Sequence, residues 1–151
     1  MLRAVLPAIA LVAATRTAQA DGQVRNPATM NCSTMVVCVD TTGEILGGSS
    51  FGTDAGPFSV TSDAGVVCEG QWRRTFGGIG LAQFTCNDAR QGTSIFIWFE
   101  PESGTVVGTG RFDDGTQAHF WGGNNLERHF REVAPEDRAR MACAPDAMLT
   151  S

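Results

Sequence analysis

Apolar and polar residues alternate in short runs along most of the chain from residue 35 onward, and Gly, Asp and Ser gather between the runs. Alternation with a period of two places successive side chains on opposite faces of an extended chain, which is the pattern of half-buried β-strands. Gly, Asp and Ser favour turns. Strands are predicted at residues 35–41, 58–61, 66–72, 79–87, 93–100, 106–112 and 117–122.

Residues 43–57 are so rich in Gly, Ser and Asp that we expect mostly turns there, with room for a brief strand near Ile45. Short local connections join the six or seven predicted strands, and no helices alternate with them. This pattern predicts an all-β fold, a mainly antiparallel meander that forms a small sandwich or barrel.

A short helical segment is predicted after the last strand. Leu126, Phe130 and Val133 recur at i, i+4 and i+7, which places them on one face of a helix. Pro135 suits the first turn of a second short helix, which Pro145 would end. The fold class is therefore all-β with a short C-terminal helical segment.

The segment 66–92 contains two apolar runs on either side of a Gly-containing turn, and each run carries one cysteine. A hairpin folded about Gly77, midway between Cys68 and Cys86, places the two cysteines directly opposite each other. Opposed residues that are not hydrogen bonded have Cα atoms about 4.5 to 5.5 Å apart, within disulfide range. We therefore predict a disulfide between Cys68 and Cys86.

Five cysteines in an exported chain indicate disulfides and one leftover thiol, because exported compartments are oxidising. Cys143 is expected to bond either Cys32 or Cys38. The remaining thiol of that pair would then be free or bonded to a partner. A bond between Cys32 and Cys38 is the rival arrangement.

The first twenty residues have the features of a secretory signal peptide, with Arg3 before an apolar stretch and Ala18-Gln19-Ala20 as a small-x-small cleavage pattern. The stretch is shorter than the roughly 20 apolar residues that cross a bilayer, so we expect no membrane insertion. The mature protein is expected in the periplasm or outside the cell. The predicted organisation is a signal peptide at 1–20, cleaved near Ala20, a flexible arm at 21–34, and a single disulfide-stabilised β-domain with a helical tail at 35–151.

The charge of the chain bears on its partners. It carries 11 basic residues, all of them arginine, and 16 acidic residues, a formal net charge of −5. Without the two arginines of the signal peptide the charge is −7. An acidic exported domain is ill suited to nucleic acid, whose phosphates attract basic proteins. We expect another exported or envelope protein as the partner.

The strand at 93–100 departs from alternation because both of its faces are apolar. By the period of two, Ile95, Ile97 and Phe99 share one face, and Phe96 and Trp98 share the other. Such a strand is usually central and covered on both sides. The C-terminal helical segment is the expected cover, and the alternative is that Phe96 and Trp98 face a partner protein.

Three short motifs follow one another in the central part of the chain: C-E-G at 68–70, G-x-G at 78–80 and C-N-D-A-R-x-G at 86–92. The series resembles a pattern of small exported β-domains of unknown function, especially from alphaproteobacteria, in which C-x-G leads to C-x-D-G-R-x-G. Ala89 stands where the pattern has glycine, which would permit a positive φ. The resemblance covers about residues 58–122 and implies an exported β-domain; it supplies no activity and no catalytic residues.

Candidate chemistry must use His119 or His129, the two histidines of the chain. His119 with Asp113 or Asp114 would make a small periplasmic enzyme in which His119 is the general base. His129 lies near arginines, as on a solvated helix face. The close ligand spacing of a zinc site is missing, and neither a metal nor another cofactor is expected.

We interpret the sequence as a non-catalytic exported binding or accessory module whose ligand is a protein. The predicted contact residues are Arg73 and Arg74, at the tip of the central hairpin, together with Phe96 and Trp98. One alternative is the periplasmic enzyme with His119. The other is a protease inhibitor that presents the Arg73 and Arg74 tip as an exposed loop.

Overall fold

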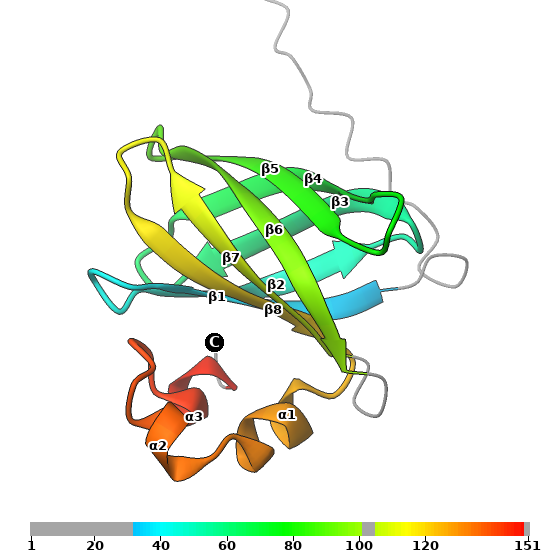
Figure 1. Ribbon diagram of the computed structural model, residues 1–151. Coiled ribbons are helices and arrows are strands. Elements are labelled where there is room, and N and C mark those ends of the chain that lie inside the picture. The colour runs from blue at the N-terminus through cyan, green and yellow to red at the C-terminus, as the bar shows by residue number, and fades with distance from the viewer. Residues whose placement is uncertain (1–31, 101–104, 150–151) are drawn as a thin grey trace, which may run out of the picture.

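The computed structural model describes residues 32–100 and 105–149, and these form an eight-stranded antiparallel barrel followed by three short helices (Figure 1). Each strand pairs with the next one along the chain, and β8 pairs with β1, which closes the barrel. The predicted antiparallel meander is confirmed, and of the two predicted forms it is the barrel. The predicted signal peptide and residues 21–31 of the predicted arm lie outside the described residues. The last three residues of that arm, 32–34, form the start of β1. The strands are β1 (Cys32–Val39), β2 (Ile45–Phe51), β3 (Ala55–Ser62), β4 (Val67–Arg74), β5 (Gly80–Cys86), β6 (Gln91–Glu100), β7 (Thr105–Phe112) and β8 (Gln117–Gly123).

The prediction of mostly turns at 43–57 is wrong, because β2 and the start of β3 occupy most of this segment. Gly48 explains the difference. It pairs with Val60 on β3, and a Cβ at residue 48 would lie 2.0 Å from the carbonyl oxygen of Ser59. Glycine here permits a close approach of two strands, a role that composition does not distinguish from a turn.

The central hairpin has the predicted register. Cys68 pairs with Cys86 across β4 and β5, and a disulfide joins them. The second disulfide joins Cys38 to Cys143, which is one of the two bonds predicted for Cys143. Cys32 is the free cysteine among the described residues and is exposed.

One half of the barrel interior is filled by a row in which large and small residues alternate. Phe58, Gly70, Phe84, Gly92 and Phe112 are successive cross-strand partners from β3 to β7. A Cβ at residue 70 would lie 2.6 Å from the Phe58 ring, and one at residue 92 would lie 2.6 Å from the Phe84 ring. Each ring thus lies over the backbone of a neighbouring glycine, which lets a narrow barrel hold several aromatic side chains.

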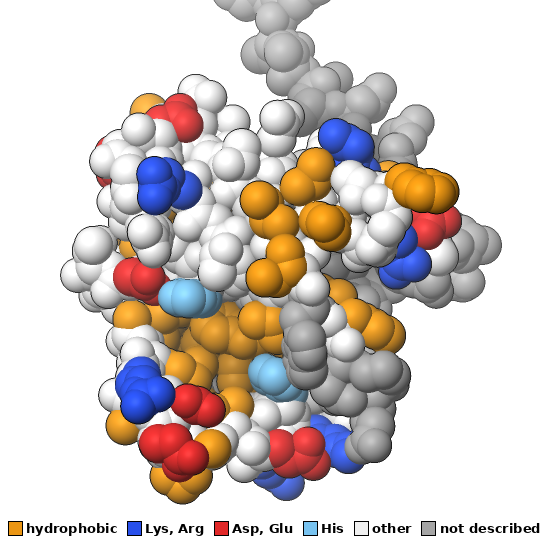
Figure 2. Space-filling model, viewed as in Figure 1, with side chains coloured by type: hydrophobic (Ala, Val, Ile, Leu, Met, Phe, Trp, Pro, Cys, Tyr) orange, Lys and Arg blue, Asp and Glu red, His pale blue; other side chains and the backbone are white. Residues whose placement is uncertain are grey.

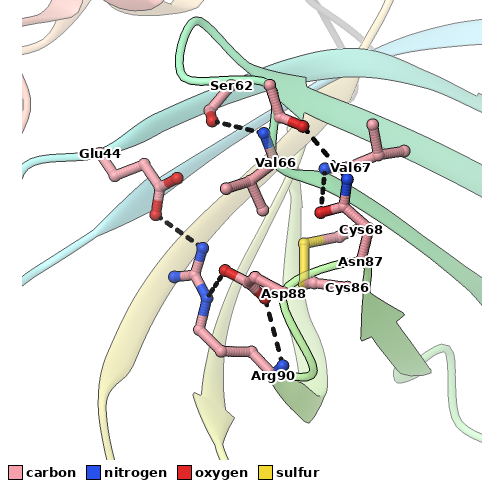
Figure 3. The surroundings of a disulfide bond; sticks show 10 residues. Glu44, Ser62, Val66, Val67, Cys68, Cys86, Asn87, Asp88 and Arg90 are labelled. Atoms are coloured by element: carbon pink, nitrogen blue, oxygen red, sulfur yellow. Dashed lines mark hydrogen bonds and ion pairs between the residues drawn. A yellow bond between two sulfur atoms is a disulfide. The ribbon is translucent and has the colours of Figure 1, made fainter.

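The barrel end that carries the β1–β2, β3–β4, β5–β6 and β7–β8 turns is closed. The Arg90 guanidinium lies 4.9 Å from the centre of the Phe112 ring and pairs with Glu44 at 2.9 Å and Asp88 at 2.7 Å. Figure 3 shows Arg90 with Glu44 and Asp88, beside the bond between Cys68 and Cys86. The core beneath it retains a void of only about 10 Å³, room for one water at most.

The helices α1 (Leu126–Glu132), α2 (Pro135–Arg138) and α3 (Pro145–Met148) lie outside the barrel, below β1 and β8 in Figure 1. The predicted stripe is present, since Leu126 and Phe130 are buried and Val133 packs against the same cluster. Their partners on the barrel wall are Val36, Cys38 and Trp121. None of the described helices is long and apolar enough to cross a membrane.

The helical segment therefore covers β1 and β8, and the prediction that it covers the strand at 93–100 is wrong. The disulfide between Cys38 and Cys143 holds the segment before α3 against β1. Trp121 lies on the outer face of β8, where its ring is 5.4 Å from that of Phe130. Apolar residues on the outer face of β1 and β8 thus form a second core with the helices, separate from the interior of the barrel.

Candidate functional site

The barrel end opposite Arg90 opens into a cavity of about 690 Å³. Met35 and Phe96 are buried in its wall, and Trp72 and Val106 are partly buried there. Exposed and partly exposed residues form the mouth. Those among the described residues are Cys32, Ser33, Ser50, Gly52, Thr53, Arg74, Gly78, Ile97, Phe99 and Asn124.

Small residues keep this half of the barrel hollow. Gly80 and Gly122 line the cavity. Gly80 pairs with Phe96, and a Cβ at residue 80 would lie 3.4 Å from the Phe96 ring. Gly122 pairs with Met35 on one side and Val106 on the other. A side chain at residue 122 would enter the space that these two residues border. The cavity therefore follows from the order of residue sizes along the strands.

Trp72 is fixed at the cavity wall by a hydrogen bond. Its indole Nε1 donates to the backbone carbonyl of Phe51 at 2.8 Å, which joins the end of β4 to the end of β2. The single polar atom of the side chain is thereby satisfied within the protein. The aromatic surface that faces the cavity needs no polar partner and suits an apolar ligand.

A β-bulge in β6 changes which side chains reach the cavity. The register shifts between Phe96 and Trp98, and beyond the shift Phe99 pairs with Val106. Phe96, Ile97 and Phe99 all line the cavity as a result. The predicted division of this strand into two alternating faces is wrong from Ile97 onward, because one extra residue reverses the alternation.

The structure separates the four residues predicted to contact a partner. Phe96 is 9% exposed and packs inside the barrel, where its ring lies 6.0 Å from that of Phe120. Its inward position gives no support to the alternative in which Phe96 faces a partner protein. The side chain of Trp98 lies outside the described part of the structure.

Arg73 and Arg74 lie within β4, whereas the turn that follows runs from Thr75 to Ile79. Arg73 is exposed and pairs with Leu81 on the outer face of the barrel. Arg74 is on the opposite face, lines the mouth of the cavity and lies 3.9 Å from Asp54. The two arginines therefore do not form one site.

His119 has an acidic neighbour, but it is neither of the predicted ones. Its Nε2 lies 3.3 Å from Oδ1 of Asp40, on the outer face of the barrel and away from the cavity lining. The carboxylate of Asp114 instead accepts a hydrogen bond from the backbone N–H of Thr116, which lowers the pKa of Asp114. Asp113 is exposed in the same turn.

Other site chemistry is sparse in the part of the chain that the structure describes. No three His, Cys, Asp or Glu side chains gather there as a metal site would need. His129 lies on α1, where its ring is 5.5 Å from that of Phe130. The cavity is thus the concave feature with a defined chemical character. Its wall is apolar, and its mouth carries Arg74 and hydroxyl groups beside Ile97 and Phe99. Comparison of the chain with protein-family models, with curated proteins and with solved structures finds no match.

Proposed function

We propose that this protein is a non-catalytic exported binding module that holds a small apolar or amphipathic molecule in the open half of the barrel. The cavity is the observation that carries the proposal. Its volume of about 690 Å³ falls within the roughly 300 to 1,000 Å³ of known ligand pockets. Met35, Trp72, Phe96 and Val106 supply the apolar surface that drives such a ligand out of water.

Two observations support the other parts of the proposal. The disulfides fit an oxidising compartment, in keeping with a signal peptide at 1–20 and release into the periplasm or the exterior. A non-catalytic role is supported by the position of His119, whose pair with Asp40 lies outside the cavity lining. A general base must reach the substrate that it deprotonates.

The experiment is a titration with the neutral apolar dye N-phenyl-1-naphthylamine, followed by dye fluorescence. The variant Val106→Trp places an indole in the cavity, and we expect it to weaken dye binding at least tenfold. Thr109→Trp is the matched control, because Thr109 is exposed on the outside of the same strand. Absence of dye binding to the wild-type protein, or equal binding by both variants in their folded state, would overturn the proposal.

A second candidate function is binding of a protein, the ligand class that the sequence predicts, by the outer wall of the barrel. Arg73, Leu81 and Ile95 are successive partners across β4, β5 and β6, and Ile95 is 47% exposed. Figure 2 shows apolar side chains gathered on the face of the barrel along which β6 runs in Figure 1. An exposed apolar group next to a charge is a frequent feature of protein interfaces.

This second candidate is tested by affinity purification from the native envelope with mass spectrometry. The informative variant is Ile95→Glu, with Thr93→Glu as the control on the same outer face of β6. A protein that is retained by wild type and Thr93→Glu and lost with Ile95→Glu would support it. Equal retention by both variants would remove it.

A further inference from the structure

We propose that the ligand of the cavity is a single-chain amphiphile with an anionic head group, and that Arg74 binds the head. The inference rests on the proposed function and names its ligand class. Arg74 is the one charged side chain among the described residues that line it. The remaining lining is apolar, glycine, or uncharged and polar.

The position of Arg74 is set by the fold. Its backbone N–H donates to the carbonyl of Asp54 at 2.6 Å, which ties the end of β4 to the loop before β3. The side chain follows Trp72 on the inner face of β4, two residues along the strand. A head group at Arg74 would therefore continue into a chain that passes the Trp72 indole and enters the apolar cavity.

The guanidinium of Arg74 is available to a ligand. Its partner in the protein is Asp54, at 3.9 Å, with side chains that are 56% and 79% exposed respectively. Exposed pairs at this distance contribute little to stability, so exchanging Asp54 for a ligand anion costs little. A guanidinium presents parallel N–H donors to two oxygens of a carboxylate or phosphate, an arrangement that a single hydroxyl cannot match.

Hydroxyl groups at the mouth fit the same head. Ser33 and Ser50 line the cavity and are partly exposed. Ser33 pairs with Ser50 across β1 and β2. Each hydroxyl can donate one hydrogen bond to an anionic oxygen. The cavity thus combines an apolar interior with a cation and donors at its mouth, which is complementary to an acidic amphiphile.

The test compares three probes of equal chain length: dodecanoate, dodecyl phosphate and dodecanol. Displacement of the neutral dye from the cavity gives the affinity of each. We expect wild type to bind the two anions at least tenfold more tightly than dodecanol, since hydrogen bonds to charged groups exceed neutral ones by about this factor. The ratio of the two anions shows whether a carboxylate or a phosphate is preferred.

Arg74→Gln removes the charge and keeps a polar, though shorter, side chain. We expect it to weaken both anions about tenfold and to leave dodecanol unchanged. Arg73→Gln is the matched control, one residue away on the outer face, and should leave all three affinities unchanged. Asp54→Asn, which removes the competing carboxylate, should strengthen binding of the anions.

Each outcome separates the two proposals. If dodecanol binds as tightly as the anions and Val106→Trp blocks all three, the cavity binds apolar ligands and the assignment of Arg74 is overturned. Equal losses with Arg74→Gln and Arg73→Gln overturn it also, because the effect is then one of overall charge. If neither the dye nor any of the three probes binds, the proposed function fails and the inference fails with it.

Discussion

The ring of Phe58 lies over the backbone of Gly70, its direct partner on the neighbouring strand, so closely that a Cβ at residue 70 would be 2.6 Å from two ring carbons. The same Cβ would be 2.3 Å from the carbonyl oxygen of Gln83. Neither the ring, which sits in the packed half of the core, nor the backbone can move away freely.

Gly70→Ala is therefore expected to lower the free energy of unfolding by about 1 to 3 kcal/mol, the usual cost of overpacking. Urea denaturation measures it. The control is Gly122→Ala, another inward-facing strand glycine, whose Cβ would meet a Val106 methyl at 3.2 Å beside the open cavity. Equal losses in the two variants would show that loss of glycine, and not the Phe58 ring, sets the cost.

Ala89 is the one non-glycine residue with a positive φ, 72°, among the described residues. It occupies the third loop position of the β5–β6 hairpin, and Gly65 and Gly115 occupy that position in two hairpins with the same backbone hydrogen bonds. A Cβ is unfavourable in this region of φ. We expect Ala89→Gly to raise the free energy of unfolding by up to about 1 kcal/mol.

The reverse change provides the control for this prediction. In Gly115→Ala no atom lies within 4 Å of the new Cβ, so the effect of the substitution comes from the positive φ of the backbone alone. It should lower the free energy of unfolding by about 1 kcal/mol. Thermal denaturation of Ala89→Gly and Gly115→Ala measures whether each raises or lowers the free energy of unfolding. Changes of the same sign in the two variants would contradict the explanation by positive φ.

The two disulfides are expected to contribute unequally to stability. The bond between Cys38 and Cys143 spans 105 residues of sequence, and the bond between Cys68 and Cys86 spans 18. In the loop-entropy description, closing the longer loop stabilises by roughly 4 to 5 kcal/mol and the shorter one by about 3. Denaturation midpoints of the two double alanine variants should show the larger loss for Cys38 and Cys143, and the opposite order would contradict this account.

Ser94 is 2% exposed on the inner face of β6, and its Oγ has no hydrogen-bond partner in the described structure. A buried hydroxyl without a partner costs roughly 1 to 3 kcal/mol. Ser94→Ala should accordingly raise the free energy of unfolding by about 1 kcal/mol. Thr93→Ala, at the exposed position before it, is the control and should change little. A loss of stability on Ser94→Ala would indicate that the hydroxyl bonds a buried water.

Local pattern was sufficient for part of the fold. The equal spacing of Cys68 and Cys86 about Gly77 predicts the hairpin register, and the apolar stripe of Leu126 and Phe130 predicts α1. These features depend on residues close in sequence. The strand β2 could not be predicted in the same way, because Gly48 permits β2 to approach β3 closely, and β3 is a separate strand of the chain.

The sequence pattern does not predict the cavity, for a related reason. Its existence depends on closure between β1 and β8, and its lining depends on the bulge at Ile97, neither of which leaves a local signature. The face predicted for Phe99 is consequently wrong, since Phe99 lines the cavity together with Phe96. One feature of the sequence does indicate the interior of the barrel. Glycines spaced by two within a strand, such as Gly108 and Gly110, occupy inner positions against which aromatic rings pack.

The pairing of β1 with β8 sets the order in which the molecule can be assembled. A chain that crosses a membrane N-terminus first can form the hairpin of Cys68 and Cys86 as soon as β5 has emerged, whereas Cys38 must wait for Cys143. During that wait the edges of β1 and of the growing sheet have no partner, and such edges invite association with other chains. In a chain exported in this way, β1 lacks its pairing with β8, and Cys38 lacks its disulfide partner, until the C-terminal part of the chain has emerged.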